Sequence, residues 1–436
     1  MDGSLSGPRI RFFIEMMEFQ MYDNAVFSAA RVANEDLSAW LPDHSVIVED
    51  GLITGVTPTS QLPSEISSSH TVYDLGDVSL LPGLMDAHFH MEFGAAGDGS
   101  HMWSPDASEV NIMHATDNLR RNLMVGLTTL RDLGTRNETA FPVLRALDEG
   151  LIPGPRVIAA GAPVTITAGH MWPFGSQADS VDEVVTAVRN QVRLGAKVIK
   201  IAASGGRGTP TANPRKAQYS AETLKAAVTE AHRSGVPIVA HTLAADGIRN
   251  CVEARIDHLI HGKWYQRDAG GGLDYDQKVV DKMAEQGQWV DPTIGSALLN
   301  LDAQKVNPDK SPTKIHWAVG ADVPLEEHME NYTRMHDSGV RFTAGLDNGD
   351  LTNSTACSWA YVELLGWDNW SAIRSATSDN AEALKIDDEV GRIRPGLVAD
   401  LAAFKGDPAV NIRELFGAQS VVQAGRPVKL HGETLI

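Results

Sequence analysis

The sequence contains few cysteines and no long apolar segment. Only Cys251 and Cys357 occur in 436 residues, which excludes a disulfide framework and fits a reducing compartment. No stretch approaches the roughly 20 apolar residues that a transmembrane helix needs. The apolar patch near the N-terminus is interrupted by Glu15 and Glu18 and lacks the form of a secretory signal. We therefore expect a soluble, cytoplasmic protein that does not enter a membrane.

Positive charge is also scarce. The chain has 37 lysines and arginines against 56 aspartates and glutamates, a formal charge of −19 at pH 7. This excess of acid argues against nucleic acid and anionic membranes as partners and leaves a small-molecule substrate open. Hydrophobic residues make up 43% and charged residues 21%, as in ordinary globular enzymes. The length suits a barrel with an accessory domain.

Both ends of the chain are rich in short β-type runs. Near the N-terminus, two such runs flank Asp50-Gly51, which is a strong signal for a hairpin. Near the C-terminus, a similar pair of runs flanks Ala424-Gly425. We therefore predict one small β-sandwich domain built from residues 1–80 and 386–436.

The middle of the chain, residues 81–385, alternates apolar strand-like runs with helix-like segments. The expected strands are 84–90, 127–134, 156–161, 197–206, 237–242, 256–262, 289–293 and 341–347. Helical segments lie between them, for example after the candidate N-cap Ser220. Eight strands with intervening helices predict an α/β fold, specifically a (β/α)8 TIM barrel. A doubly wound sheet is the alternative, but no glycine-rich phosphate-binding motif follows the first strand.

Polar side chains end several of these apolar strands. On a strand, Asp86, His88 and His90 share one face because side chains alternate with a period of two. The polar residues at or near the ends of strands 1, 4, 5, 6 and 8 are His88, His90, Lys200, His241, His261 and Asp347. In such barrels the chemistry lies at the carboxyl ends of the strands. Four imidazoles and a carboxylate there form a ligand set for zinc or a similar divalent ion.

Lys200 is the unusual member of this set. An ammonium group directed at metal cations would be repelled. A carbamate, formed when the amine reacts with CO2, would instead be an anionic bridge between two metals. Paired metals share a hydroxide that serves as the nucleophile.

The remaining histidines are not assigned as metal ligands, although His101 and His114 follow strand 1 and could reach the barrel mouth. Strand alternation places His258 on the face opposite His261, so we interpret it as structural. The histidines expected at the surface are His44, His70, His232, His316, His328, His336 and His431.

At this point the sequence resembles the amidohydrolase superfamily over nearly its whole length. The segments that carry the resemblance are "LLPGLMDAHFH", "TTLRDLG", "GAKVIKIAASGG", "QYSAETLKAAVTEAHRSGVPIVAHT", "IDHLIHG", "SATSDNAEAL" and "GRIRPGLVADLAAFKGDP". The sequence is most similar to the imidazolonepropionase-related group, which includes Xaa-Pro dipeptidases, ochratoxin-hydrolysing amidases and phenylurea or carbamate hydrolases.

The resemblance implies a role for each candidate residue. It places His88 and His90 on a more buried metal and His241 and His261 on a more exposed one. It makes Lys200 the N6-carboxylated bridge between two divalent ions, expected to be zinc. Asp347 would contact the buried metal and shuttle the proton from the bridging hydroxide to the leaving group. His170, in "VTITAGHMWPFG", would polarise the substrate carbonyl.

The implied activity is hydrolysis of an amide-type C–N bond in a dipeptide, an N-acyl amino acid or an aryl amide, by a homo-oligomeric enzyme. Carbamate, urea or lactone hydrolysis is the alternative. A deaminase would need a glutamate three residues after His241, where Ala244 stands. A decarboxylase or dehydratase on the same metal barrel remains open, whereas a non-enzymatic relative would be expected to lose ligands.

Two departures from the family pattern concern the substrate pocket. Strand 8 reads Gly345-Leu346-Asp347 where relatives often have Gly-Thr-Asp, and the loop after it lacks their His-Gly. The aromatic residues of the predicted pocket loops are Trp103, Trp172, Phe174, Trp264 and Tyr265, which favours an apolar or aryl group on the substrate. Arg207 and Arg215 are candidates to hold a substrate carboxylate.

Overall fold

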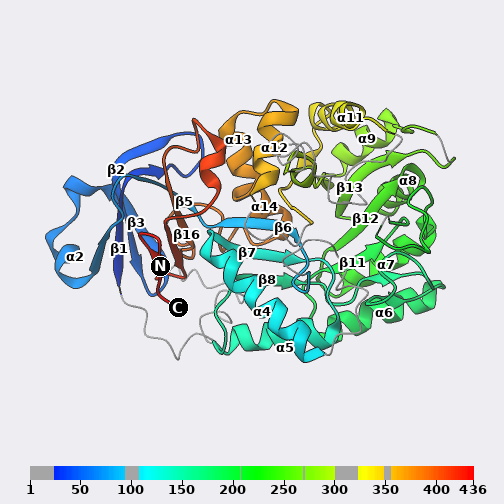
Figure 1. Cartoon of the computed structure of the whole chain (residues 1–436), viewed down its shortest axis with the longest axis horizontal. Helices are drawn as coiled ribbons and strands as arrows, with labels where there is room; N and C mark the ends of the chain where they lie inside the picture. The colour runs from blue at the N-terminus through cyan, green and yellow to red at the C-terminus, as the bar shows by residue number, and fades with distance from the viewer. Residues whose placement is uncertain (1–23, 94–107, 207, 269–270, 300–322, 348–354) are drawn as a thin grey trace, which may run out of the picture.

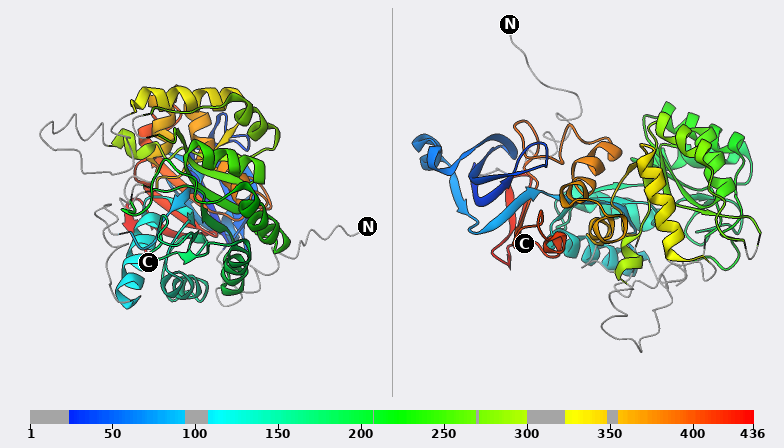
Figure 2. Two further views of the ribbon diagram at one scale, coloured as in Figure 1. Left: turned by 90° about the vertical axis from the view of Figure 1, so that its right-hand side faces the viewer. Right: turned by 90° about the horizontal axis from the view of Figure 1, so that it is seen from above.

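The computed structural model describes residues 24–93, 108–206, 208–268, 271–299, 323–347 and 355–436. Its strands form one nine-stranded sheet and two parallel sheets of seven and three strands. Figure 1 shows the nine-stranded sheet at one side of the molecule and the parallel strands, surrounded by helices, at the other. Figure 2 shows the same arrangement from two further sides. Among the described residues, no helix combines the length and hydropathy needed to cross a bilayer.

The nine-stranded sheet joins both ends of the chain. Its strands are β1 (Ala25–Ala33), β2 (Trp40–Glu49), β3 (Leu52–Pro58), β4 (Thr71–Asp74), β5 (Val78–Pro82), β16 (Leu401–Lys405), β17 (Ser420–Gln423), β18 (Arg426–Leu430) and β19 (Glu433–Thr434). Antiparallel pairing of β5 with β16 connects the two ends. At the predicted turn Asp50-Gly51, φ is 50° and 77°, and at Ala424-Gly425 it is 47° and 79°. Positive φ at both central residues is the backbone of a type I′ hairpin turn.

The parallel strands follow the predicted order. The three-stranded sheet contains β6 (Leu84–Phe89), β7 (Leu127–Asp132) and β8 (Arg156–Ala159). The seven-stranded sheet contains β9 (Val164–Thr165), β10 (Ser176–Gln177), β11 (Ile199–Ala202), β12 (Ile238–Ala244), β13 (His258–Tyr265), β14 (Trp289–Asp291) and β15 (Arg341–Phe342). Each of the eight predicted strands therefore overlaps a strand of the structure. β15 is shorter than the predicted strand 341–347, because only Arg341 and Phe342 pair with β14.

Backbone hydrogen bonds also join the two parallel sheets to each other. The N–H of Lys197, before β11, donates to the carbonyl of Ala159 in β8 at 3.0 Å. At the other edge, the N–H of Ala87 in β6 donates to the carbonyl of Ala344, after β15, at 2.9 Å. The N–H of Asp347 then donates to the carbonyl of His88 at 2.9 Å. Residues 343–347 thus continue alongside β6 although they are not assigned as strand.

Helices follow most of the parallel strands. The helical elements are η1 (Thr59–Gln61), α2 (Ser64–Ser69), α4 (Ser108–Met124), α5 (Asn137–Asp148), α6 (Val181–Leu194), α7 (Ala221–Arg233), α8 (Ala245–Ala254), α9 (Gln277–Glu285), α11 (Leu325–Asp337), α12 (Ala356–Leu365), α13 (Asn369–Ser375), α14 (Ser378–Leu384) and η3 (Ile412–Leu415). Ser220 caps α7 by accepting the N–H of Thr223, as predicted. The apolar face of α7, including Leu224 and Ala231, packs into the main core.

A buried ion pair ties the nine-stranded sheet to the parallel strands. Arg156 in β8 donates from Nη1 to Oδ2 of Asp400 at 2.7 Å and to Oγ1 of Thr129 at 3.1 Å. The other oxygen of Asp400 accepts the N–H of Ala424 at 2.7 Å. The side chains of Arg156 and Asp400 are only 11% and 3% exposed. The carboxylate therefore depends on this guanidinium for charge compensation.

We expect Arg156→Met to destabilise the protein by about 3 kcal/mol, because removing one partner of a buried pair leaves the other charge uncompensated. Urea unfolding, followed by circular dichroism, measures the change. Arg145→Met is the matched control, since the Arg145 side chain is 80% exposed beside Glu149 and its loss should leave the unfolding midpoint unchanged. Equal shifts for the two variants would show that the Arg156–Asp400 pair does not stabilise the fold.

Candidate metal centre

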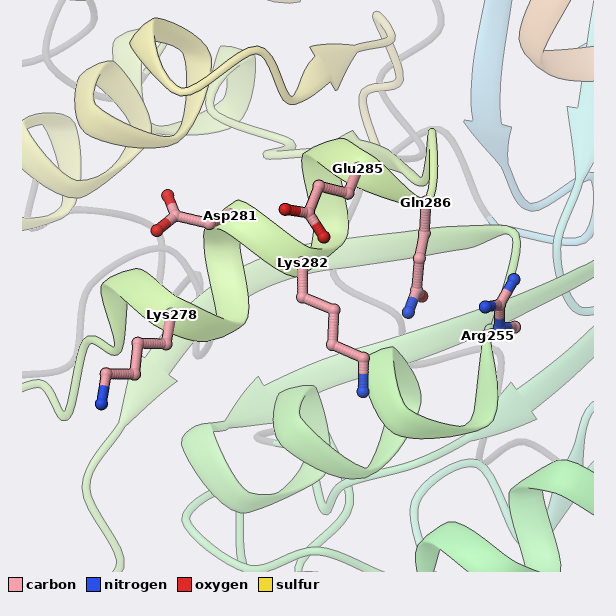
Figure 3. Close-up of a pocket in the computed structure, with 6 residues that line it drawn as sticks. All are labelled: Arg255, Lys278, Asp281, Lys282, Glu285 and Gln286. Atoms are coloured by element: carbon pink, nitrogen blue, oxygen red, sulfur yellow. The ribbon is translucent and has the colours of Figure 1, made fainter.

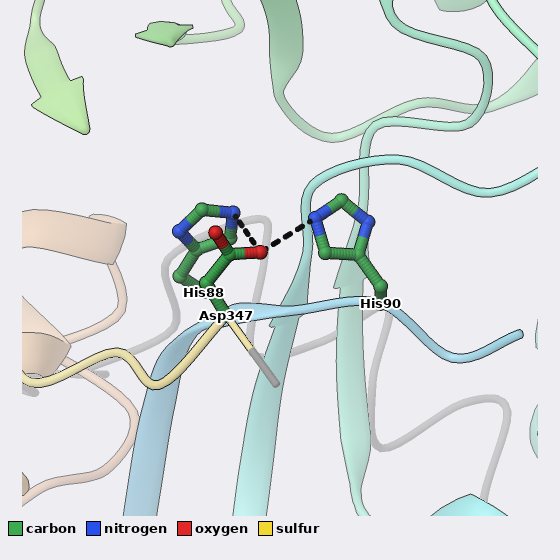
Figure 4. Close-up of side chains that lie close together, drawn as sticks. All are labelled: His88, His90 and Asp347. Atoms are coloured by element: carbon green, nitrogen blue, oxygen red, sulfur yellow. Dashed lines mark ion pairs between the residues drawn. The ribbon is translucent and has the colours of Figure 1, made fainter. Parts of the chain in front are cut away.

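Asp347 lies at the centre of a group of buried histidines. Its Oδ1 lies 3.4 Å from Nε2 of His88 and 3.2 Å from Nε2 of His90, and its Oδ2 lies 3.7 Å from Nε2 of His261. Figure 4 shows His88 and His90, both from the end of β6, on either side of this carboxylate. One candidate ligand atom from each of His88, His90 and Asp347 lies within 4.8 Å of the others. The structure thus brings these predicted ligands together.

His241 and His261 extend this group across β12 and β13. Nε2 of His261 lies 3.1 Å from Nδ1 of His241, and their ring centroids are 4.7 Å apart. The ring of His88 lies 5.6 Å from that of His261. The four predicted histidine ligands are therefore contiguous, and each is at most 5% exposed.

Hydrogen bonds at the outer side of three rings determine which nitrogen carries the proton. Nδ1 of His90 lies 2.7 Å from the carbonyl of Gly134, and Nε2 of His241 lies 3.2 Å from the carbonyl of Gly205. A carbonyl only accepts, so both nitrogens are protonated donors. Nδ1 of His261 lies 2.8 Å from Oγ1 of Thr293, whose hydroxyl already donates to the carbonyl of Pro292. This Nδ1 must therefore also donate.

The remaining ring nitrogens of His241 and His261 consequently direct lone pairs at each other. Nδ1 of His241 faces Nε2 of His261 without a proton between them, and Nε2 of His90 faces the carboxylate of Asp347. Among the described residues, neither ring nitrogen of His88 has a hydrogen-bond partner. Converging lone pairs repel unless a cation lies between them. The donor set thus fits a divalent metal, because neutral imidazoles with a second hydrogen bond are typical zinc ligands.

Burial keeps three of these rings neutral. It lowers the pKa of His88, His241 and His261 well below the usual value, because an imidazolium is poorly solvated away from water. The positive charge of Lys200 lowers each of these pKa values further. A neutral imidazole is the form that binds a metal.

Lys200 lies in β11 with 2% of its surface exposed. Burial lowers the pKa of its ammonium to about 7, and the negative charge of Asp347 partly offsets the effect. A large fraction of the amine is therefore neutral near pH 7. Only the neutral amine has the lone pair that reaction with CO2 requires, so this environment suits the predicted carbamate.

His170 lies beside the histidine group, on the loop between β9 and β10. Its ring centroid is 4.2 Å from that of His241, and its Nδ1 lies 3.0 Å from Oγ1 of Thr209. Burial, followed by the charges of Lys200 and His90, lowers its pKa to about 3. The ring is therefore a neutral hydrogen-bonding group near the predicted ligands.

Asp86 connects the two chain segments that carry His88 and Asp347. Its Oδ1 accepts the N–H of His88 at 2.8 Å and the N–H of Leu346 at 3.2 Å. The residue is 1% exposed, and burial raises its pKa to about 7. One carboxyl oxygen thus aligns the end of β6 with the turn that presents Asp347.

The structure corrects the placement of His258. Strand alternation was expected to turn it away from His261, but φ at His261 is 70°, which interrupts the alternation. Nδ1 of His258 contacts Nη2 of Arg131 at 2.9 Å, and its Nε2 lies 3.0 Å from Oγ1 of Thr343. His258 therefore points among the parallel strands, as His261 does. Of the histidines expected at the surface, His70 and His328 are buried, and His316 lies outside the described residues, as does His101.

Sequence reasoning missed a set of buried charges near the ligands. Arg131, which is 2% exposed, donates from Nε to the carbonyl of Ala87 in β6. Burial lowers its pKa to about 10, and the charges of Asp291 and Asp86 oppose this shift. Arg131 stands in "TTLRDLG" at a strand position, and a charged residue inside an apolar strand was the signal available.

Most of the predicted pocket aromatics are core residues. Trp264 and Tyr265 are 0% and 1% exposed, and Phe174 is 7% exposed, whereas Trp172 is 38% exposed. Arg215 donates to the carbonyls of Gln266 and Gly271 and thus anchors the segment after β13. Trp103 and Arg207 lie outside the described residues.

A separate surface pocket is drawn in Figure 3. Its lining residues are Arg255, Lys278, Asp281, Lys282, Glu285 and Gln286. Arg255 precedes β13, so the pocket lies at the amino-terminal end of that strand, whereas the predicted ligands lie toward the carboxyl ends. It carries both signs of charge and is not part of the candidate metal centre.

The chain is similar to known proteins in sequence and in fold. The amidohydrolase family model matches residues 79–428. Ochratoxinase of Aspergillus niger is 27% identical over 429 residues, covering 89% of this chain and 83% of the relative. A prolidase solved with N-methylphosphonate-L-proline is 25% identical, with a TM-score of 0.77 and coverage of 93% and 100%. A solved molinate hydrolase, 21% identical with a TM-score of 0.76 over 96% and 97% of the chains, shares the fold.

We expect Asp86→Ala to weaken retention of loaded zinc about 10- to 100-fold, the usual effect of losing a group that orients metal ligands. Metal content after dialysis against graded chelator concentrations measures it. Asp86→Asn is the matched control, because its amide oxygen still accepts the N–H groups of His88 and Leu346 and should preserve retention. Wild-type retention in the alanine variant would contradict an orienting role.

Proposed function

Because this chain belongs to the amidohydrolase family, we propose that it is a metal-dependent hydrolase that cleaves an amide-type C–N bond of a small molecule. The family match and the ochratoxinase and prolidase relatives make it a hydrolase acting on carbon–nitrogen bonds. The observation that supports the metal most directly is the pair of lone pairs from His241 and His261. These face each other beside the carboxylate of Asp347.

The proposed scaffold is a (β/α)8 barrel made by β6, β7, β8, β11, β12, β13, β14 and β15. The backbone hydrogen bonds from Lys197 to Ala159 and from Ala87 to Ala344 support closure, because they connect β8 to the start of β11 and β6 to the segment after β15. The barrel would span residues 81–385, and the β-sandwich would contain residues 1–80 and 386–436. The predicted ligands then lie at the catalytic face of such a barrel.

We assign two divalent ions, expected to be zinc, to the candidate metal centre. His88, His90 and Asp347 would hold one ion, His241 and His261 the other, and carboxylated Lys200 both. Such ions lower the pKa of a water molecule and polarise a carbonyl. Burial of the rings and their outer hydrogen bonds would hold the ligand nitrogens in place.

Asp347 and His170 would carry the proton and charge transfers of the reaction. The Asp347 side chain is 15% exposed, so this carboxylate is within reach of water and substrate. It would accept the proton of the attacking water and return it to the leaving nitrogen, which is too basic to depart as an anion. Neutral His170 would donate a hydrogen bond to the carbonyl oxygen as negative charge develops there.

The substrates that we propose are dipeptides, N-acyl amino acids or aryl amides. The names of the ochratoxinase and prolidase relatives support this class. Partly exposed Trp172, two residues after His170, offers an apolar surface for a substrate side group. At the position where a deaminase carries its acid, the structure has buried Ala244. Carbamates and ureas remain the second candidate class, since the fold is shared with molinate hydrolase.

We expect Lys200→Ala to reduce the bound metal from about two ions to one or fewer and to abolish turnover, because the bridging ligand is lost. Elemental analysis after zinc and bicarbonate loading measures stoichiometry, and added short carboxylic acids should restore part of the activity. Lys197→Ala, which removes an exposed lysine three residues earlier, should leave the metal content and the turnover unchanged. Full metal content and rate in Lys200→Ala would refute the bridging role.

The function is tested by assaying zinc-loaded wild type and Asp347→Asn on dipeptides, N-acyl amino acids, aryl amides, carbamates, ureas and activated aryl esters. We expect amide turnover by the wild type and a loss of about 10²–10⁴ in the variant, the range for general acid–base catalysis. Activated esters should lose less, because their leaving groups depart without a proton. Turnover of carbamates or ureas alone would overturn the amide assignment, and an equal loss on esters would make Asp347 only a ligand.

A further inference from the structure

The hydroxyl of Thr209 contacts the backbone N–H of Met171 and the ring of His170. In the contact with His170, it must be decided which of the two atoms carries the proton. Oγ1 accepts the N–H of Met171 at 3.1 Å and lies 3.0 Å from Nδ1 of His170. Thr209 is 3% exposed, so its own hydroxyl proton is withheld from bulk water. Among the described residues, the only hydrogen-bond acceptor that the structure offers to this proton is Nδ1 of His170.

We propose that Thr209 is a positioning residue that holds His170 with Nδ1 unprotonated and Nε2–H directed toward the substrate. If Nδ1 carried the proton instead, the Thr209 hydroxyl would receive two donors and leave its own proton buried without an acceptor. An unsatisfied buried donor is costly, whereas the proposed assignment satisfies every group.

The surroundings of His170 leave its ring little room to turn. A Cβ on Gly206 would lie 2.3 Å from Nδ1 and Cε1 of His170, so the ring packs directly on the backbone at this glycine. The N–H of His170 donates to Oε1 of Gln218 at 2.7 Å, and Nε2 of Gln218 donates to the carbonyl of Ala202 in β11 at 2.8 Å. The backbone of His170 is thus connected through Gln218 to β11. The hydrogen bond from Thr209 then fixes Nδ1 on the inner side of the ring and leaves Nε2 on the outer side.

The proton assignment on His170 does not depend on the proposed function. Its consequence for catalysis does rest on the proposed function. With Nδ1 held by Thr209, Nε2–H is the donor left for the carbonyl oxygen of an amide. The other tautomer would present a lone pair to the developing oxyanion and repel it. Thr209 would therefore support the transition state without touching the reacting atoms.

Nitrogen NMR tests the proton assignment independently of any substrate. In protein labelled with ¹⁵N at the histidine rings, His170 is identified by comparison with His170→Gln. We expect a pyridine-type signal for Nδ1 and a protonated, pyrrole-type signal for Nε2 in the wild type. In Thr209→Val, the signals should show exchange between tautomers or ring orientations. A protonated Nδ1 in the wild type, or an unchanged spectrum in the valine variant, would overturn the proposal.

Kinetics on a substrate found by the amide panel test the consequence. We expect Thr209→Val to lower kcat about 10-fold or more, with KM changing much less, because the lost donor acts in the transition state. Thr209→Ser keeps the hydroxyl and should restore both the spectrum and kcat. Thr211→Val is the matched control, since Thr211 lies on the same loop and its hydroxyl donates to the carbonyl of Ala168 at 2.7 Å instead of contacting the His170 ring. An equal loss of kcat in Thr211→Val would assign the effect to the loop instead.

If no amide is hydrolysed, the proposed function fails while the NMR result still decides the proton assignment.

Discussion

Two neutral imidazoles, His241 and His261, whose lone pairs face each other 3.1 Å apart impose the main constraint on this structure. Such an arrangement is unfavourable in the absence of a cation, and each ring is held in it by a hydrogen bond on its far side. The carbonyl of Gly205 and the hydroxyl of Thr293 supply these bonds, and the carbonyl of Gly134 holds the ring of His90 in a similar way. The protein therefore spends folding free energy on directing donor atoms toward one point, which is how a preorganised metal site is built.

The surrounding fold explains how this arrangement persists. His88 and Asp347 are far apart in sequence, but Asp86 accepts backbone N–H groups from both segments. Arg131 and His258 fill the neighbouring interior with further charge and hydrogen bonds. Buried polar groups of this kind favour one arrangement of the strands, because each slipped register would leave several of them unsatisfied.

The same burial that excludes water also sets the charge of two candidate site residues. It makes Lys200 a partly neutral amine near pH 7 and keeps His170 uncharged. Both effects have one physical origin, the poor solvation of a cation among apolar strands. Apolar packing around the strands thus contributes to chemistry as well as to stability.

The sequence by itself determined the order of strands and helices, the two hairpin turns and the six polar strand-end residues. These follow from local rules: alternation along a strand, turn residues with positive φ, and polar side chains that interrupt apolar runs. The tertiary structure alone decided the inward position of His258, because a positive φ at His261 interrupts strand alternation. It also decided that Trp264 and Tyr265 are core residues and that Asp86, Arg131 and Thr209 support the site. Those outcomes depend on contacts between segments distant in sequence, and no local pattern specifies which side chain meets which partner there.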